Sequence, residues 1–137
     1  IGSVQLKKLS SFIDNRRQNA TLFQSLFEGE KNFTIQKEIG QSSWFGFSII
    51  LTNKLSNYRD DLVNILIENK IECRPIVAGT FTKNPVIKFL EYKISGNLNA
   101  SNEIDKSGFF VGNDFRNLTN EIKHLHKILK DFEENII

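Results

Sequence analysis

The stretch RPIVAGTFTKNP, residues 74–85, does most to define the fold of this sequence. It predicts a strand end that breaks into a tight loop and then restarts as a helix. The proline after Arg74 disfavours a helical backbone at the arginine. Gly79 lets the loop backbone approach a ligand closely. Asn84 followed by Pro85 supplies a capping amide and then a ring that fits the first helical position.

Such a loop suits either of two roles. It can present the permanent charge of Arg74 and several backbone amides to an anionic ligand. Alternatively, it is an ordinary turn whose arginine pairs with a surface carboxylate. These twelve residues alone leave both interpretations open.

The segment before the loop predicts a helix that leads into a strand. Ser56 or Asn57 is expected to cap the helix. Residues 71–76 alternate as a strand, so that Cys73 faces the core and Arg74 faces outward. Cys73 is then a small core residue, since nothing nearby in the sequence would activate a thiolate. The core face of the helix is expected to carry Leu62, Val63, Leu66 and Ile67.

Hydrophobic periodicity predicts the remaining elements. Apolar residues recur at helical spacing in the first and last segments, and aromatic and β-branched residues mark the strands. The first helix face carries Leu6, Leu9, Ile13, Ala20, Phe23 and Phe27, and the last carries Leu118, Ile122, Leu125, Leu129, Phe132 and Ile136. Strands are expected at residues 44–51, 71–76 and 109–113, with a further short strand at 33–35, and short helices at 85–90 and 102–107. This order predicts an α+β fold with a small antiparallel sheet of about three strands flanked by helices.

Composition limits the class of protein. The 137 residues form one domain, 1–137, and a net charge of +2 gives no indication of a nucleic-acid partner. No apolar run is long enough for a membrane span, so no membrane partner is expected. The single cysteine fits a reducing cytoplasm. The chain contains no methionine and opens on Ile1, which predicts a piece of a longer protein.

Complete catalytic machinery is not evident. His124 and His126 lie two positions apart on a predicted helix and cannot share a metal ion. Asp60 with Asp61 fits a solvated helix face better than a catalytic pair. The sequence therefore predicts no catalytic, cofactor-binding or metal-binding residue in this chain, and Arg74 with the Gly79 loop is its best binding feature.

Several segments occur in an order that resembles a known family. SSWFGFSI (42–49), the long run from residue 57 to residue 87, EYKISGNL (91–98) and GFFVGN (108–113) resemble the C-terminal part of the DegT–StrS sugar aminotransferase family. The loop at 74–85 looks like the branch that dehydrates nucleotide-linked 4-keto-6-deoxy sugars. Within that branch it is more similar to the GDP-4-keto-6-deoxymannose 3-dehydratase type than to the CDP-glucose type.

The resemblance implies the C-terminal small domain of a fold type I enzyme that uses pyridoxal or pyridoxamine phosphate. The large cofactor domain would then lie upstream of Ile1. Members of this branch remove the C3 hydroxyl of the sugar, with a histidine in place of the usual Schiff-base lysine, in deoxysugar synthesis for lipopolysaccharide O-antigen. A homodimer and glutamate as amino donor are also implied. Two alternatives stay open: a sugar-nucleotide 4-aminotransferase of the same family, and a stand-alone binding or dimerisation module.

The resemblance also implies substrate contacts. Arg74 is expected to meet substrate hydroxyls or the diphosphate. Gly79, Thr80 and Phe81 would line the loop, and Asn113 would stand near the subunit or pocket edge. The sequence departs from the family pattern at Lys70, where glycine often closes the helix, so the turn there must use Asn69 or accept strain. It also departs at Thr80, which is more commonly asparagine in this branch, and at Asp114, where histidine is frequent.

Overall fold

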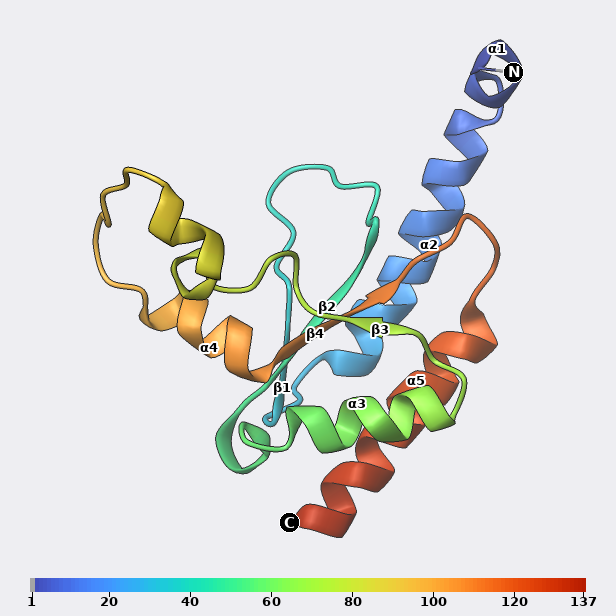
Figure 1. Cartoon of the computed structure of the whole chain (residues 1–137). Helices are drawn as coiled ribbons and strands as arrows, with labels where there is room; N and C mark the ends of the chain where they lie inside the picture. The colour runs from blue at the N-terminus through green and yellow to red at the C-terminus, as the bar shows by residue number, and fades with distance from the viewer. Residues whose placement is uncertain (1) are drawn as a thin grey trace.

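A four-stranded antiparallel sheet organises the computed structural model, which describes residues 2–137 (Figure 1). The strands are β1 (Phe33–Ile35), β2 (Gly46–Leu51), β3 (Cys73–Arg74) and β4 (Gly108–Gly112), in the spatial order β1-β2-β4-β3. The helices are α1 (Gly2–Leu6), α2 (Leu9–Phe27), α3 (Arg59–Glu68), α4 (Asn99–Ser107) and α5 (Thr119–Ile136), with 3₁₀ turns η1 (Asn53–Leu55), η2 (Phe81–Lys83) and η3 (Pro85–Phe89). The predicted α+β class and small antiparallel sheet are confirmed, and the short segment at 33–35 supplies the fourth strand.

The main core lies on one face of the sheet, under α2, α3 and α5. Strand alternation places Phe47, Ile49 and Leu51 of β2 on this face, and the register pairs Phe47 with Val111 and Ile49 with Phe109. The Phe23 ring of α2 stacks on Phe47 with centroids 4.2 Å apart. This packing fixes α2 against the centre of the sheet.

The helical stripes are confirmed where they meet this core. Ile122, Leu125, Leu129 and Phe132 of α5 are buried, as are Ala20, Phe23 and Phe27 of α2. The prediction of one continuous N-terminal helix is wrong at its start, because α1 ends at Leu6 and α2 begins at Leu9. Both leucines are exposed and do not join the core. Figure 1 shows that α1 and the start of α2 extend past the sheet, beyond the core that buries the rest of α2.

The predicted ends of α3 differ from those observed. Its N-cap is Tyr58, without a side-chain cap bond, so neither Ser56 nor Asn57 caps the helix. At the other end of the helix, Lys70 has a φ of +66°. This residue therefore adopts a left-handed backbone conformation, although it is not glycine. The chain then enters β3, which keeps only Cys73 and Arg74 because only these two residues pair with β4.

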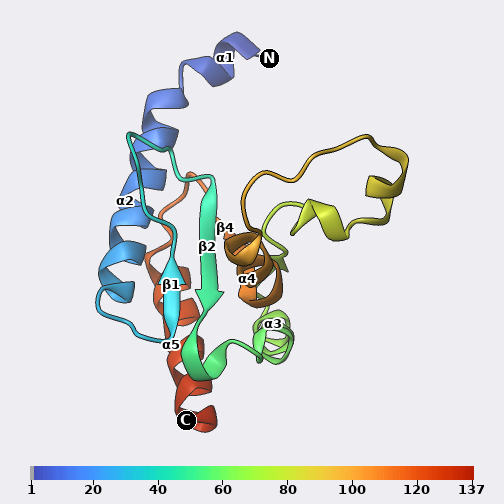
Figure 2. The same cartoon turned by 90° about the vertical axis from the view of Figure 1, so that its left-hand side faces the viewer.

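Between β3 and α4 the chain makes a long excursion, residues 75–98, here called the 75–98 arm. Figures 1 and 2 show this arm extending away from the sheet, on the side opposite α2. Its short helix is a 3₁₀ turn, η3, and the Asn84 side chain caps it by accepting from the Val86 amide at 3.0 Å, as predicted. The arm carries very exposed apolar side chains, with Val77 93% and Phe89 86% exposed. The helical turn expected at 102–107 begins earlier, at Asn99.

Candidate functional site

Arg74 lies at the end of β3 and points away from the core. Cys73 pairs with the buried Val111, whereas Arg74 pairs with Phe110, so alternation sends the two side chains to opposite faces as predicted. The guanidinium donates through Nε and Nη2 to Glu72 Oε1, at 3.0 and 2.6 Å. Both side chains are exposed, 72% and 75%, and such a pair contributes little to stability. Arg74 is therefore accessible to a ligand that can compete with one surface carboxylate.

An open groove of about 1000 Å³ borders Arg74 and is here called the Arg74 groove. The Phe45 and Phe110 rings stack beside it with centroids 5.8 Å apart, and Phe45 is 74% exposed. On the far side Arg116 donates through Nε to Asp114 Oδ2 at 2.7 Å. The groove thus combines aromatic rings with three arginines, Arg16, Arg74 and Arg116. Those groups suit a ligand with a planar ring and a phosphate.

Asn113 lines the same groove, but its amide is bonded within the protein. Its Nδ2 donates to the carbonyl oxygens of Trp44 at 2.8 Å and Arg16 at 3.0 Å. Its Oδ1 accepts from Asn19 Nδ2 at 3.1 Å. Asn113 therefore joins α2, the turn before β2 and the end of β4. No local sequence pattern indicates Asn19 as its partner, because the two residues are 94 positions apart.

Gly79 and Thr80 connect the 75–98 arm to α4. Gly79 has φ +64°, and a Cβ added there would lie 2.1 Å from Asp105 Oδ1. The Thr80 amide donates to this same oxygen at 3.2 Å, and the buried Thr80 hydroxyl donates to the Ser101 carbonyl at 2.8 Å. These two residues hold the base of the arm in place, and the Thr80 side chain faces α4.

Asp105, which sequence reasoning did not identify, has a second partner in the arm. Its Oδ2 accepts from Lys83 Nζ at 2.9 Å. The hydrogen bond from Lys83, followed by that from the Thr80 amide, lowers the pKa of Asp105 below its ordinary value. An aspartate in a polar helix sequence gave no sign of this contact.

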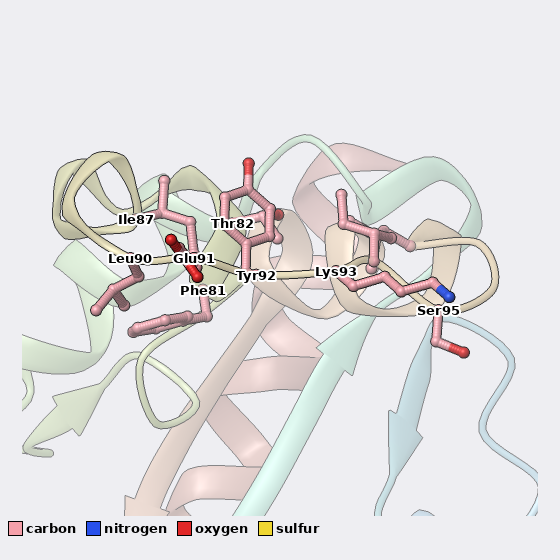
Figure 3. Close-up of a pocket in the computed structure, with 10 residues that line it drawn as sticks. Phe81, Thr82, Ile87, Leu90, Glu91, Tyr92, Lys93 and Ser95 are labelled. Atoms are coloured by element: carbon pink, nitrogen blue, oxygen red, sulfur yellow. The ribbon is translucent and has the colours of Figure 1, made fainter.

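Phe81 belongs to a different concavity, a pocket of about 360 Å³ within the arm, shown in Figure 3. Figure 3 shows Phe81 and Leu90 at one end of the pocket, the Tyr92 ring in the middle, and Lys93 with Ser95 at the other end. The lining is mainly apolar and aromatic. The structure therefore brings Arg74 and Asn113 to one groove and places Phe81 in another.

The lysines that line the two concavities do not have the surroundings of a Schiff-base lysine. A lysine that forms a Schiff base has to be desolvated to lose its proton, but Lys70 and Lys93, which line the two concavities, are both exposed. Cys73 is not an activated nucleophile either, because burial, and then the charge of Glu72, raises its pKa to about 11.

Residues 2–137 contain no group of histidine, cysteine, aspartate or glutamate side chains that could hold a metal ion. None of the helices in this range is long and apolar enough to cross a membrane.

The fold places the chain in a structural class, since its solved neighbours are enzymes with the pyridoxal phosphate-dependent aminotransferase fold. The crystal structure of E. coli GDP-4-keto-6-deoxy-D-mannose-3-dehydratase with bound hydrated PLP superposes with a TM-score of 0.89. The two sequences are 43% identical, over 93% of this chain and 33% of that one. Two further solved structures of a GDP-4-keto-6-deoxymannose-3-dehydratase, also with TM-scores of 0.89, contain a trapped PLP-glutamate geminal diamine and, in a variant, bound GDP-perosamine.

Sequence comparison gives the family. Residues 1–124 match the DegT/DnrJ/EryC1/StrS aminotransferase family, and the chain belongs to this family. It is 52% identical to the GDP-4-keto-6-deoxy-D-mannose 3-dehydratase of Yersinia pseudotuberculosis over 131 residues, which cover 95% of this chain and 33% of that protein. The chain thus spans about a third of the length of this curated relative.

Proposed function

We propose that the complete protein is a pyridoxamine phosphate-dependent 3-dehydratase and that this chain forms one wall of its sugar-nucleotide pocket. Its substrate would be a GDP-linked 4-keto-6-deoxy sugar, used in deoxysugar synthesis for lipopolysaccharide O-antigen. The observation that carries the proposal is the 52% identity to a curated 3-dehydratase across nearly the whole chain. The cofactor site would lie in the upstream domain.

The Arg74 groove is the part of this chain that we assign to the nucleotide sugar. Arg74 would exchange its exposed bond with Glu72 for a charge-assisted bond to the diphosphate or a sugar hydroxyl. The exposed Phe45 ring offers a stacking surface to a planar base. Of the other expected contact residues, Phe81 would line an adjacent part of the pocket. Gly79, Thr80 and Asn113 would hold the backbone around the pocket in position.

Further features of the complete protein belong to the same proposal. Glutamate would serve as the amino donor, in keeping with the glutamate adduct trapped in a related enzyme. A homodimer and a cytoplasmic location are proposed from the family resemblance and the single, reduced cysteine.

The proposal is tested by supplying the complete protein with pyridoxal phosphate, glutamate and GDP-4-keto-6-deoxymannose. Mass spectrometry of the sugar product should show loss of the C3 hydroxyl and retention of the 4-keto group. A product that keeps the hydroxyl and gains an amine would instead support the 4-aminotransferase. Absence of both products, with no binding of GDP, would support the stand-alone module.

A further inference from the structure

The base of the 75–98 arm is hydrogen-bonded to α4, and two of these bonds go to one carboxylate. Asp105 Oδ1 accepts from the Thr80 amide at 3.2 Å, and Oδ2 accepts from Lys83 Nζ at 2.9 Å. These partners lie on both sides of Phe81, so the carboxylate spans the turn that carries this ring. A third bond, from the Thr80 hydroxyl to the Ser101 carbonyl at 2.8 Å, fixes the same turn to the preceding part of α4.

The position of the carboxylate depends on a missing side chain. Asp105 Oδ1 lies 2.1 Å from the place that a Cβ at residue 79 would occupy, so only glycine leaves room for it. The left-handed backbone of Gly79, φ +64°, also favours glycine at this position. The Thr80 amide thus binds the Asp105 carboxylate, and the absence of a Cβ at Gly79 leaves room for it.

Asp105 itself is held by a rigid part of the molecule. Helix α4 runs directly into the central strand β4, with Ser107 as the last residue of the helix and Gly108 as the first of the strand. The fully buried Ser107 donates through Oγ to the Ser56 carbonyl at 2.8 Å. The carboxylate therefore connects the arm to the middle of the sheet.

We propose that Asp105 is a positioning residue that holds the 79–83 turn against α4 and so sets where Phe81 and the start of the arm stand relative to the substrate. The effect on substrate rests on the proposed function, whereas the ordering of the turn does not. An isolated surface ion pair would contribute almost nothing, but this carboxylate also receives a backbone amide and occupies space that only glycine provides.

The first measurement is hydrogen exchange on the complete protein, with Asp105→Ala compared with Glu103→Ala, an exposed residue of the same helix. Asp105→Ala should speed exchange of the Thr80 amide about tenfold or more and increase tryptic cleavage after Lys88. Glu103→Ala should change neither. Unchanged exchange at Thr80 in Asp105→Ala would overturn the proposal, whatever the activity of the protein.

Two more variants separate the parts of the contact. Asp105→Asn keeps an oxygen for the Thr80 amide but loses the charge for Lys83, so its exchange should lie between those of the wild type and Asp105→Ala. Gly79→Ala should reproduce the Asp105→Ala result, because its methyl group displaces the carboxylate. Gly96→Ala is the matched control, since Gly96 has φ +74° but nothing within 4 Å of an added Cβ. Equal exchange at Thr80 in the Gly79 and Gly96 variants would contradict the steric argument.

The second measurement is steady-state kinetics with the nucleotide sugar. Asp105→Ala should raise KM about tenfold with a smaller change in kcat, and Asp105→Glu should restore part of the loss. A normal KM with a loosened turn would refute the role in substrate positioning. A wild-type protein that does not turn over the nucleotide sugar would refute the proposed function, and the exchange result would still decide whether Asp105 holds the turn.

Discussion

Single buried residues in this chain have roles that their chemical type does not reveal. Asn113 is the main example: a polar side chain beside a groove suggests a ligand contact, yet its amide bonds two carbonyl oxygens and another asparagine. Truncation would leave the Trp44 and Arg16 carbonyl groups without this donor in a largely buried place. Unsatisfied buried groups of this kind cost about 1–3 kcal/mol each.

We therefore expect Asn113→Ala to lower the free energy of unfolding by about 2–3 kcal/mol. Urea denaturation followed by circular dichroism measures this change. Asn120→Ala, an exposed asparagine in the first turn of α5, is the matched control and should change stability by less than about 0.5 kcal/mol. Similar losses for the two variants would show that the buried bonds of Asn113 do not matter.

The role of Arg74 is also tested at the scale of one residue. In the complete protein, Arg74→Ala should weaken nucleotide-sugar binding or turnover about tenfold or more, because a charge-assisted bond contributes about 1.5–3 kcal/mol. Calorimetry with GDP and steady-state kinetics provide the measurement.

Glu72→Gln is the matched variant for this prediction. It keeps the guanidinium but removes the carboxylate that competes for it, so binding should be retained or become tighter. Arg74→Ala with unchanged binding, or Glu72→Gln with an equal loss, would remove Arg74 from the site.

At the scale of elements, a charged cluster connects α5 to the end of α2. Lys130 Nζ lies 2.9 Å from Glu30 Oε2 and also bonds Glu133, and the two carboxylates are largely buried. The hydrogen bonds that Lys130 donates, first to Glu133 and then to Glu30, raise its pKa. Burial alone would raise the pKa of Glu133, but hydrogen bonds from Lys130 and Asn32 outweigh it and lower this pKa.

We expect Lys130→Met to lower the free energy of unfolding by about 1–2 kcal/mol at neutral pH, because Glu30 and Glu133 then lose the lysine that they share; partial exposure of Lys130 moderates the loss. Lys127→Met, on the exposed side of α5, should have little effect.

The pKa of Glu133 is lower in the folded state than its ordinary value of 4.5. The stabilisation by ionised Glu133 is therefore complete above pH 4.5 and is lost as the pH falls through the pKa of the folded state. Denaturation curves from pH 7 to pH 3 should therefore converge for wild type and variant. A difference that persists at the acidic end would contradict the ionic explanation.

On the scale of the whole molecule, the exposed apolar side chains include two groups that the core does not cover. One is the start of the chain, at Leu6 and Leu9, and the other is the 75–98 arm, at Val77 and Phe89. Exposed apolar groups in such numbers mark surfaces that bind other protein or ligand. In the relatives, this domain is about a third of the protein.

We expect the isolated chain to retain no pyridoxal phosphate, because the lysines that line its two concavities, Lys70 and Lys93, are both exposed. The measurement is the absorbance spectrum after addition of the cofactor and dialysis. A cofactor band that survives dialysis would show that this chain has a site of its own. Bovine serum albumin is a useful control for adventitious reaction with surface lysines.

Local pattern predicted the order of the main helices and strands of this protein, but not the break between α1 and α2 or the shortness of β3. The α5 stripe, the alternation in β2 and the Asn84-Pro85 helix start follow from spacings of a few residues, and these spacings survive in the structure because each one matches a buried face or a cap. Even the family loop was visible, since its residues are contiguous. Local pattern failed at the helix starts, where caps such as Ser56 and Asn57 competed with tertiary packing.

The distribution of the site residues depended on tertiary structure. Thr80 meets Asp105 across 25 positions and Asn113 meets Arg16 across 97, and no local spacing encodes such contacts. The sequence by itself determined an α+β chain with an outward-facing Arg74. Only the tertiary structure places Arg74 and Phe81 in separate concavities and bonds the Asn113 amide within the protein. Both placements depend on which distant backbone groups come within hydrogen-bonding distance.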